Sequence, residues 1–153
     1  GQLLAALEDY NTAIAINPKL ASAYNNRANY HASQGNLVEA IDDYESAIDL
    51  DPTNVRAWIN QAITFRDLEM YAQAVENLEH ALQIHQLLMR HSEEDQFLEA
   101  HIYATRGRTH YLAGDWNYAI ADYYRALDRL EDSDNPTIQR LRSQVQTWLE
   151  ELH

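Results

Sequence analysis

The chain has 153 residues, of which 46% are hydrophobic, and its formal net charge of −13 argues against nucleic acid, whose phosphate backbone favours a basic partner surface. It contains no cysteine, which excludes disulfides, thiolate zinc sites and cysteine nucleophiles and fits a cytoplasmic location. We expect no membrane insertion, because no apolar run approaches the ~20 residues that a membrane-spanning helix needs.

The sequence matches itself when it is shifted by 34 residues. Pro18 then aligns with Pro52, and Ala40 aligns with Ala74. A fixed period of this length indicates stacked units of supersecondary structure. In the unit at 21–52, two amphipathic segments flank a Gly-Asn pair, which predicts two helices joined by a tight turn. One helix pair cannot bury its own apolar face, so neighbouring units must cover it.

Five segments follow one another in this single predicted domain of residues 1–153. They are the second half of a truncated repeat (1–18), a repeat (21–52), a repeat with an extended second helix (55–91), a repeat with an extended first helix (93–131) and a capping helix (136–152). The last follows a Ser-Asp-Asn-Pro sequence, which supplies an N-cap and a first-turn proline. A half-polar helix of this kind ends a solenoid, so we expect the C-terminal end to be complete.

The N-terminal segment is expected to expose apolar side chains. Gly1 aligns with the turn residue Gly35, so the chain begins midway through a repeat. Leu3, Leu4 and Leu7 then lack the helix that would precede them. Either further repeats lie upstream, or this edge is covered in a dimer.

The third segment departs from the period. Glu69 replaces the turn glycine, and the interval to the next turn glycine is eleven residues longer than one period. We expect a helix from about Tyr71 to His91, followed by a capping box at Ser92 that opens the next helix. Shared equally, the added residues lengthen each helix by roughly 8 Å at ~1.5 Å per residue. The sequence therefore predicts a helical hairpin at 84–98 that projects from one edge.

These patterns resemble the tetratricopeptide repeat family. In the second segment, its succession of aromatic, small and turn residues is met by Tyr24, Ala28, Gly35, Ala40, Tyr44, Ala47 and Pro52. The resemblance implies an all-α fold, a right-handed superhelical solenoid of antiparallel helix pairs with about 3.5 repeats plus a C-terminal capping helix. It also implies that first helices line a concave groove, and that the chain is an interaction scaffold rather than an enzyme.

Charge is divided unequally between the two kinds of helix. The first helices, at 21–34, 55–68 and 100–113, carry five arginines against one aspartate, so the net acidity belongs to the remainder of the chain. In the implied solenoid this gives a neutral-to-basic groove inside an acidic shell. Either the groove selects acidic partners, or the outer helices are acidic only for solubility.

The face that the resemblance assigns to the groove carries eight polar residues. They are Asn25, Asn26, Asn29, Arg56, Asn60, His101, Thr105 and Arg108. Asparagine offers a donor and an acceptor, so a row of them can hold the backbone of an extended peptide; the alternative is that they are ordinary solvated residues. Chaperone-binding members of the family capture a C-terminal carboxylate, but most of the cations of that clamp are absent here. We therefore do not expect a carboxylate clamp.

A pair of polar residues recurs at a spacing of sixteen. The pairs are Arg27 with Asp43, Gln61 with Asn77, and Arg106 with Asp122. We interpret them as ion pairs that link the two helices of a repeat, with an amide pair in place of the ion pair in the third segment.

No catalytic residue, metal site or cofactor is expected. His80 and His85 are five residues apart, which does not place two metal ligands side by side on a helix. We interpret them, and His91 on the hairpin, as surface histidines.

The predicted function is that of a scaffold that binds a protein or peptide partner, with acidic groups favoured by the groove arginines. One alternative is a homo-oligomer, assembled through the open N-terminal edge or the 84–98 hairpin. Another is a regulatory or targeting domain of a larger protein.

Overall fold

The computed structural model describes residues 2–131 and 133–153, and within them the chain forms eight α-helices and no strand. The predicted all-α class is confirmed. The helices fall into two compact units, residues 1–70 and 71–153. The boundary lies inside the predicted repeat 55–91, and the organisation of the whole chain as a single repeat domain stays a prediction. The turn predicted at Gly1 lies outside the described residues.

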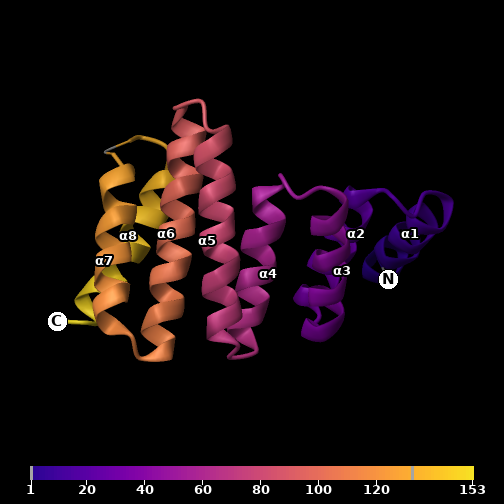
Figure 1. Cartoon of the computed structure of the whole chain (residues 1–153), viewed down its shortest axis with the longest axis horizontal. Helices are drawn as coiled ribbons and strands as arrows, with labels where there is room; N and C mark the ends of the chain where they lie inside the picture. The colour runs from indigo at the N-terminus through magenta and orange to yellow at the C-terminus, as the bar shows by residue number, and fades with distance from the viewer. Residues whose placement is uncertain (1, 132) are drawn as a thin grey trace. The chain divides into compact units, whose positions relative to one another are not determined.

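The first unit contains four helices, α1 (Gln2–Ile16), α2 (Ala21–Ser33), α3 (Leu37–Leu50) and α4 (Val55–Asp67). Each helix packs against the next, and α2 also contacts α4 (Figure 1). Gly35, with φ of +77°, makes the left-handed turn between α2 and α3 that only glycine adopts without strain. Ala28, Ala40 and Tyr44 are buried together between these two helices, as expected where small residues let helices approach closely.

Helix α1 exposes much of its apolar surface. None of its residues is buried, and Leu3 and Leu4 are 58% and 60% exposed, which confirms the expectation for these two side chains. Leu7 is half-buried. A polar contact ties α1 to α2, because Arg27 donates from Nη1 to Oδ1 of Asn11 at 2.9 Å.

Both predicted ion pairs between the helices of a repeat are confirmed. Arg27 donates through Nε and Nη2 to the two carboxylate oxygens of Asp43, each at 2.7 Å. Arg106 donates to Asp122 in the same way, at 2.7 and 2.8 Å. Both aspartates are buried. The two-pronged hydrogen bonding of the guanidinium therefore compensates the solvation that each carboxylate loses.

The amide that replaces arginine in the third segment has partners within the first unit. Gln61 is buried and donates from Nε2 to the carbonyl oxygen of Ile41 at 3.2 Å and to Oε2 of Glu45 at 3.0 Å. Its predicted partner, Asn77, belongs to the second unit, so that amide pair stays a prediction.

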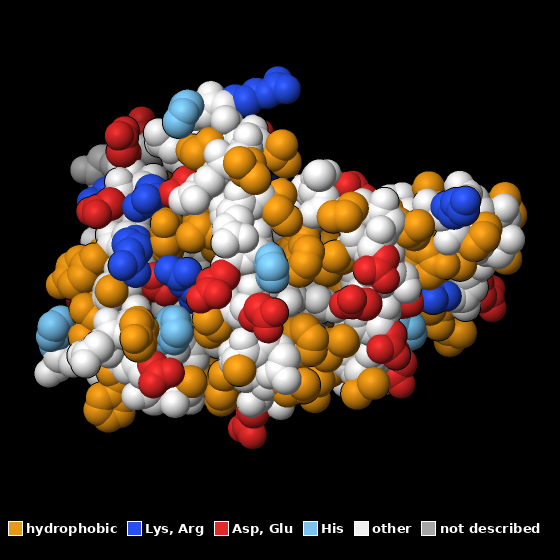
Figure 2. All heavy atoms as spheres, in the orientation of Figure 1, with side chains coloured by type: hydrophobic (Ala, Val, Ile, Leu, Met, Phe, Trp, Pro, Cys, Tyr) orange, Lys and Arg blue, Asp and Glu red, His pale blue; other side chains and the backbone are white. Residues whose placement is uncertain are grey.

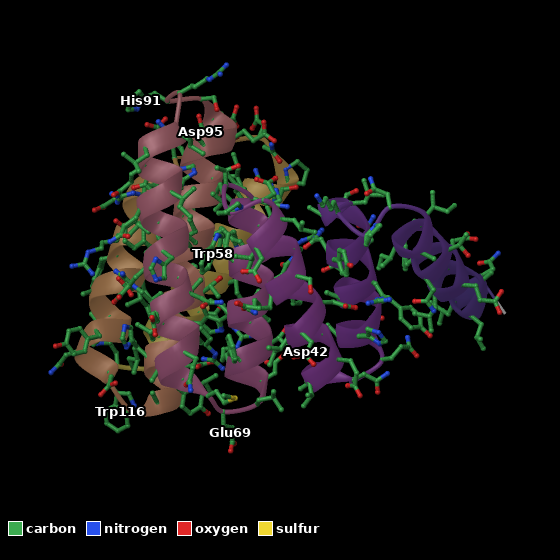
Figure 3. All side chains as sticks on the ribbon, turned by 45° about the vertical axis from the view of Figure 1, so that its right-hand side comes forward. Asp42, Trp58, Glu69, His91, Asp95 and Trp116 are labelled. Carbon is green, nitrogen blue, oxygen red and sulfur yellow. The ribbon has the colours of Figure 1, made fainter. Side chains whose placement is uncertain are left out.

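Among residues 2–131 and 133–153, two residues other than glycine adopt left-handed backbone. Glu69 has φ of +60° and His91 has φ of +59°; Glu69 follows α4, and His91 lies in the loop before α6 (Figure 3). Such a conformation costs ~1–2 kcal/mol in a residue with a Cβ. The turn after α4 is thus kept although its glycine is lost.

The second unit contains α5 (Tyr71–Leu88), α6 (Glu93–Ala113), α7 (Trp116–Arg129) and α8 (Pro136–Glu150). Helix α6 packs against α5 and α7, and α8 packs against α6 and α7 (Figure 1). The capping box at the start of α6 is confirmed. The N–H of Asp95 donates to Oγ of Ser92 at 3.1 Å, and the N–H of Ser92 donates to the Asp95 carboxylate at 3.3 Å.

We expected the two helices to share the added residues equally, but they do not. Helix α5 ends at Leu88 rather than His91 and has 18 residues against 14 in α3, whereas α6 has 21 against 13 in α4. At ~1.5 Å per residue, the extensions are about 6 Å and 12 Å. The capping box explains the difference, because it starts α6 immediately after the loop.

The extended part of α6 is anchored at its base, and the projection of the hairpin from the repeats stays a prediction. Phe97 and Ala100 pack against Leu130 and Ile138, two buried side chains that flank the connection from α7 to α8. Exposed side chains lie on both sides of the loop, with Leu87 at 85% on α5 and Glu93 and Glu94 exposed on α6. The base of the extension therefore packs in the core of the second unit, whereas its tip is exposed.

Helix α8 begins as predicted. Oδ1 of Asn135 accepts from the N–H of Thr137 at 2.9 Å, and Pro136 is in the first turn. Val145 and Leu149 are buried in the cluster that contains Tyr123. The polar-sided helix thus covers the apolar face of the preceding pair.

Candidate functional site

Helices α2 and α4 bring two of the predicted asparagines together. Nδ2 of Asn60 donates to Oδ1 of Asn29 at 3.4 Å, and the hydroxyl of Tyr44, from α3, donates to the same oxygen. The two donors fix the orientation of the Asn29 amide, because its oxygen must face both of them. The exposed Asn29 Nδ2 group has no hydrogen-bond partner among residues 2–131 and 133–153, so it can donate to a ligand.

Three further predicted residues lie on the same two helices. Asn25 is one turn before Asn29, and its Oδ1 is buried without a hydrogen-bond partner in the described part of the chain. Asn26 is exposed. Arg56 is one turn before Asn60, is exposed, and forms no ion pair with any described residue. This polar face, Asn25, Asn26, Asn29, Arg56 and Asn60, presents amide donors and acceptors beside one uncompensated cation.

The other predicted residues, His101, Thr105 and Arg108, are on α6 in the second unit. Thr105 is 6% exposed and its Oγ1 donates to the carbonyl oxygen of His101 at 2.7 Å. Its choice as a contact residue was wrong, because helical spacing alone does not distinguish a groove position from one covered by packing. His101 is half-buried, and its ring stacks on Phe97 with 6.3 Å between centroids.

Arg108 is already engaged within the second unit. Its Nη1 donates to Oε2 of Glu151 at 2.9 Å. The guanidinium also lies 4.7 Å from the ring centroid of Tyr111 and 5.1 Å from that of Trp148, distances typical of cation–π contacts. An acidic ligand at this position would therefore compete with Glu151. No local pattern predicts this pairing, because Glu151 is 43 residues away.

Sequence reasoning also missed the role of Tyr44. Its periodicity assigned it to the core, where it is 2% exposed, but its hydroxyl reaches the polar face. The choice of tyrosine instead of phenylalanine was the available signal, since a buried tyrosine hydroxyl usually has a hydrogen-bond partner.

A second polar cluster was also missed. His85 is 3% exposed, not at the surface as predicted, and its Nε2 lies 3.9 Å from Oε2 of the buried Glu99. Arg129 donates from Nε to Oε1 of Glu99 at 2.6 Å. The three side chains come from α5, α6 and α7, which the extension of α6 brings together. Within the described residues, no group of three or more candidate ligands is arranged to hold a metal ion.

Family comparisons agree with the geometry of the helix pairs. Three models of tetratricopeptide repeats match residues 1–35, 21–54 and 43–76. The chain belongs to the tetratricopeptide repeat family. These matches cover the first half of the sequence, and structural similarity extends the tetratricopeptide fold through the second. None of the curated proteins compared with the chain matches it.

Solved tetratricopeptide structures show the same fold at low sequence identity. A crystal structure of MamA is 19% identical with a TM-score of 0.72; the match covers 84% of this chain and 64% of that one. The N-terminal domain of stress-induced protein-1 from C. elegans is 22% identical with a TM-score of 0.65, covering 82% and 94%. The first tetratricopeptide domain of Spaghetti (RPAP3), bound to an HSP90 peptide SRMEEVD, is 22% identical with a TM-score of 0.61, covering 85% and 93%.

The matching family models all describe repeats, and none describes an enzyme. Within the described residues, no helix combines the length and apolar character needed to cross a membrane.

Proposed function

We propose that this tetratricopeptide chain is a protein-interaction scaffold that binds an extended peptide of a partner on the polar face of α2 and α4. The contact between Asn60 and Asn29, held in place by Tyr44, carries the proposal. In this contact the Asn29 side chain uses its acceptor, Oδ1, internally and keeps its donor, Nδ2, available for a ligand. A peptide carbonyl oxygen is the matching group, and every extended peptide supplies one.

Arg56 gives this face a preference for acidic peptides. It is exposed and forms no ion pair with a described residue, so a carboxylate of the ligand can pair with it without displacing an internal partner. His101 and Arg108, on α6 of the second unit, are proposed as separate contact residues. Arg108 takes part when an acidic group of the ligand replaces Glu151, whereas buried Thr105 is left out.

The relative bound to SRMEEVD offers a probe of this proposal. The peptide is titrated into the protein by calorimetry, beside a version with both glutamates replaced by lysine and a version with an amidated C-terminus. We expect SRMEEVD to bind and the lysine version to bind at least fivefold more weakly. Amidation should change affinity little, because most of the cations of a carboxylate clamp are absent.

Arg56→Gln tests the charge preference on its own. It should lower the affinity for SRMEEVD and reduce its salt dependence, because one screened ion pair is lost. Arg142→Gln, a change on α8, is the matched control. Absence of binding by all three peptides, or equal affinity for the acidic and lysine versions, would contradict the proposal.

Self-association is a second candidate function, and the apolar surface of α1 favours it. Leu3 and Leu4 are 58% and 60% exposed, and Ile16 is 80% exposed. Light scattering over a range of concentrations tests this function, and Leu3→Ser/Leu4→Ser should abolish any dimer. A constant monomer mass at every concentration would exclude it.

A further inference from the structure

Two adjoining cavities lie where the extended start of α6 meets the beginning of α8. Their volumes are about 330 and 490 Å³, and Glu93, Phe97 and Ile138 line both of them. They are therefore parts of one pocket, whose size is within the range for ligand sites. The pocket lies wholly within the second unit and contains none of the residues of the polar face on α2 and α4.

The pocket combines an apolar floor with an acidic rim. Leu130 and Ile138 are 3% and 7% exposed, and the half-buried ring of Phe97 lies beside them. Glu93 and Glu131 are exposed and line the smaller of the two cavities. Figure 2 shows acidic side chains on the second unit at this end of its helices, and Figure 3 places Asp95 beside the α5–α6 loop at the same end.

Arg129 is the one cation among the residues that line the pocket, and groups of the protein itself already pair with it. Arg129 donates from Nε to Glu99 at 2.6 Å and from Nη1 to the carbonyl oxygen of Arg125 at 2.9 Å. Its guanidinium also lies 4.6 Å from the ring centroid of Tyr103. The glutamates of the rim therefore have no matching positive charge among the lining residues.

The helix N-termini beside the pocket do not turn it into an anion site. The first N–H groups of α6 are capped by Ser92, and its first turn already holds Glu93, Glu94 and Asp95, which offset the positive end of the helix dipole. The first turn of α8 is capped by Asn135. The chemistry of the pocket thus favours a cation with an apolar stem.

We propose that this pocket binds an arginine side chain of a partner protein. The methylene groups of the arginine lie on Leu130 and Ile138, and the planar guanidinium stacks on Phe97. Its donors pair with the carboxylates of Glu93 and Glu131, whose geometry suits a guanidinium. This site binds the opposite charge from the polar face on α2 and α4, so a partner can carry acidic and basic segments for two separate surfaces.

The test uses the full chain and the peptide acetyl-Ala-Leu-Arg-Leu-Ala-amide, with a version in which citrulline replaces arginine. Citrulline keeps the length and shape of the side chain but removes its charge. We expect backbone amide signals at the start of α6 and α8 to shift on titration with the arginine peptide. The citrulline peptide should bind at least tenfold more weakly.

Two variants test whether the carboxylates of Glu93 and Glu131 bind the arginine peptide. Glu93→Gln/Glu131→Gln should weaken arginine-peptide binding at least fivefold, whereas Glu150→Gln, at the other end of α8, should leave it unchanged. Equal binding of the arginine and citrulline peptides, equal affinity of the double variant and wild type, or no binding at all would overturn the proposal. Asn60→Ala should have no effect here, so failure at this pocket is distinguishable from failure of the polar face.

Discussion

Arg106 and Asp122 form the more deeply buried of the two ion pairs between helices of a repeat. The side chain of Asp122 is 1% exposed and that of Arg106 is 15% exposed, against 9% and 23% for Asp43 and Arg27. Asp122 also accepts from Nη1 of Arg125 at 2.8 Å. Loss of this carboxylate would leave a partly buried guanidinium without its partner.

Asp122→Ala is therefore expected to lower the free energy of unfolding by ~3–5 kcal/mol, as when one partner of a buried pair is removed. Asp43→Ala should cost less, because Arg27 retains more contact with water. Urea denaturation measures both changes, with exposed Asp128→Ala as control at about 0.5 kcal/mol or less. If Asp122→Ala matched the control, the pair would have no role in stability.

Gly107 allows α6 and α7 to approach closely. A Cβ at this position would lie 2.7 Å from two ring carbons of Tyr123, a fully buried side chain. Gly107→Ala should lower the free energy of unfolding by ~1–3 kcal/mol through overpacking, although alanine gains about 1 kcal/mol in helix propensity.

The matched control is Ala113→Gly, which loses helix propensity near the end of α6 without a clash. Thermal unfolding compares both with wild type. An increase in stability for Gly107→Ala would show that Tyr123 moves aside easily, and would contradict the close approach.

Substitution of Glu69 is expected to raise stability, in contrast to the substitutions above. Its φ of +60° is strained for glutamate but relaxed for glycine. Glu69→Gly should raise the free energy of unfolding by up to about 1 kcal/mol, because the relief of strain exceeds the added entropy of the unfolded chain. A urea midpoint below that of wild type would show that the turn is not strained.

Tyr44 makes stability depend on alkaline pH. Burial raises the pKa of its hydroxyl to about 12, whereas an unfolded tyrosine titrates near about 10. The folded state holds the proton more tightly, so this contribution is complete below about pH 10 and is lost as the pH rises through about 12. Tyr44→Phe should reduce the loss of stability between those values.

Urea midpoints at pH 9 and pH 11.5 measure this difference, with Tyr118→Phe, at a 66% exposed position, as control. An equal loss of stability in Tyr44→Phe and wild type would contradict the raised pKa.

The sequence predicted what depends on local pattern. The 34-residue period located the helix pairs, the capping box placed the start of α6 at Ser92, and the spacing of sixteen residues identified Arg27 with Asp43. Each of these features is written in neighbouring residues or repeated at a fixed interval. Helical geometry converts such spacing directly into proximity.

Features that depend on distant residues were not predictable in this way. The pairing of Arg108 with Glu151 was not foreseen, and His85 was assigned to the surface although the longer α6 buries it beside Glu99. Both contacts arise where the eleven added residues and the capping helix change the packing of the repeat. The hydroxyl of Tyr44 was missed because periodicity does not distinguish the apolar ring from its polar end.

The position of the bound peptide tests the central claim most directly. SRMEEVD is titrated into wild type, Asn29→Ala, Asn60→Ala and the control Asn117→Ala, an exposed position on α7. Loss of one hydrogen bond of ~1 kcal/mol corresponds to about a fivefold loss of affinity. We predict that loss for Asn29→Ala and Asn60→Ala and wild-type affinity for Asn117→Ala. Unchanged affinity in both of the first two variants would show that the peptide does not bind on α2 and α4.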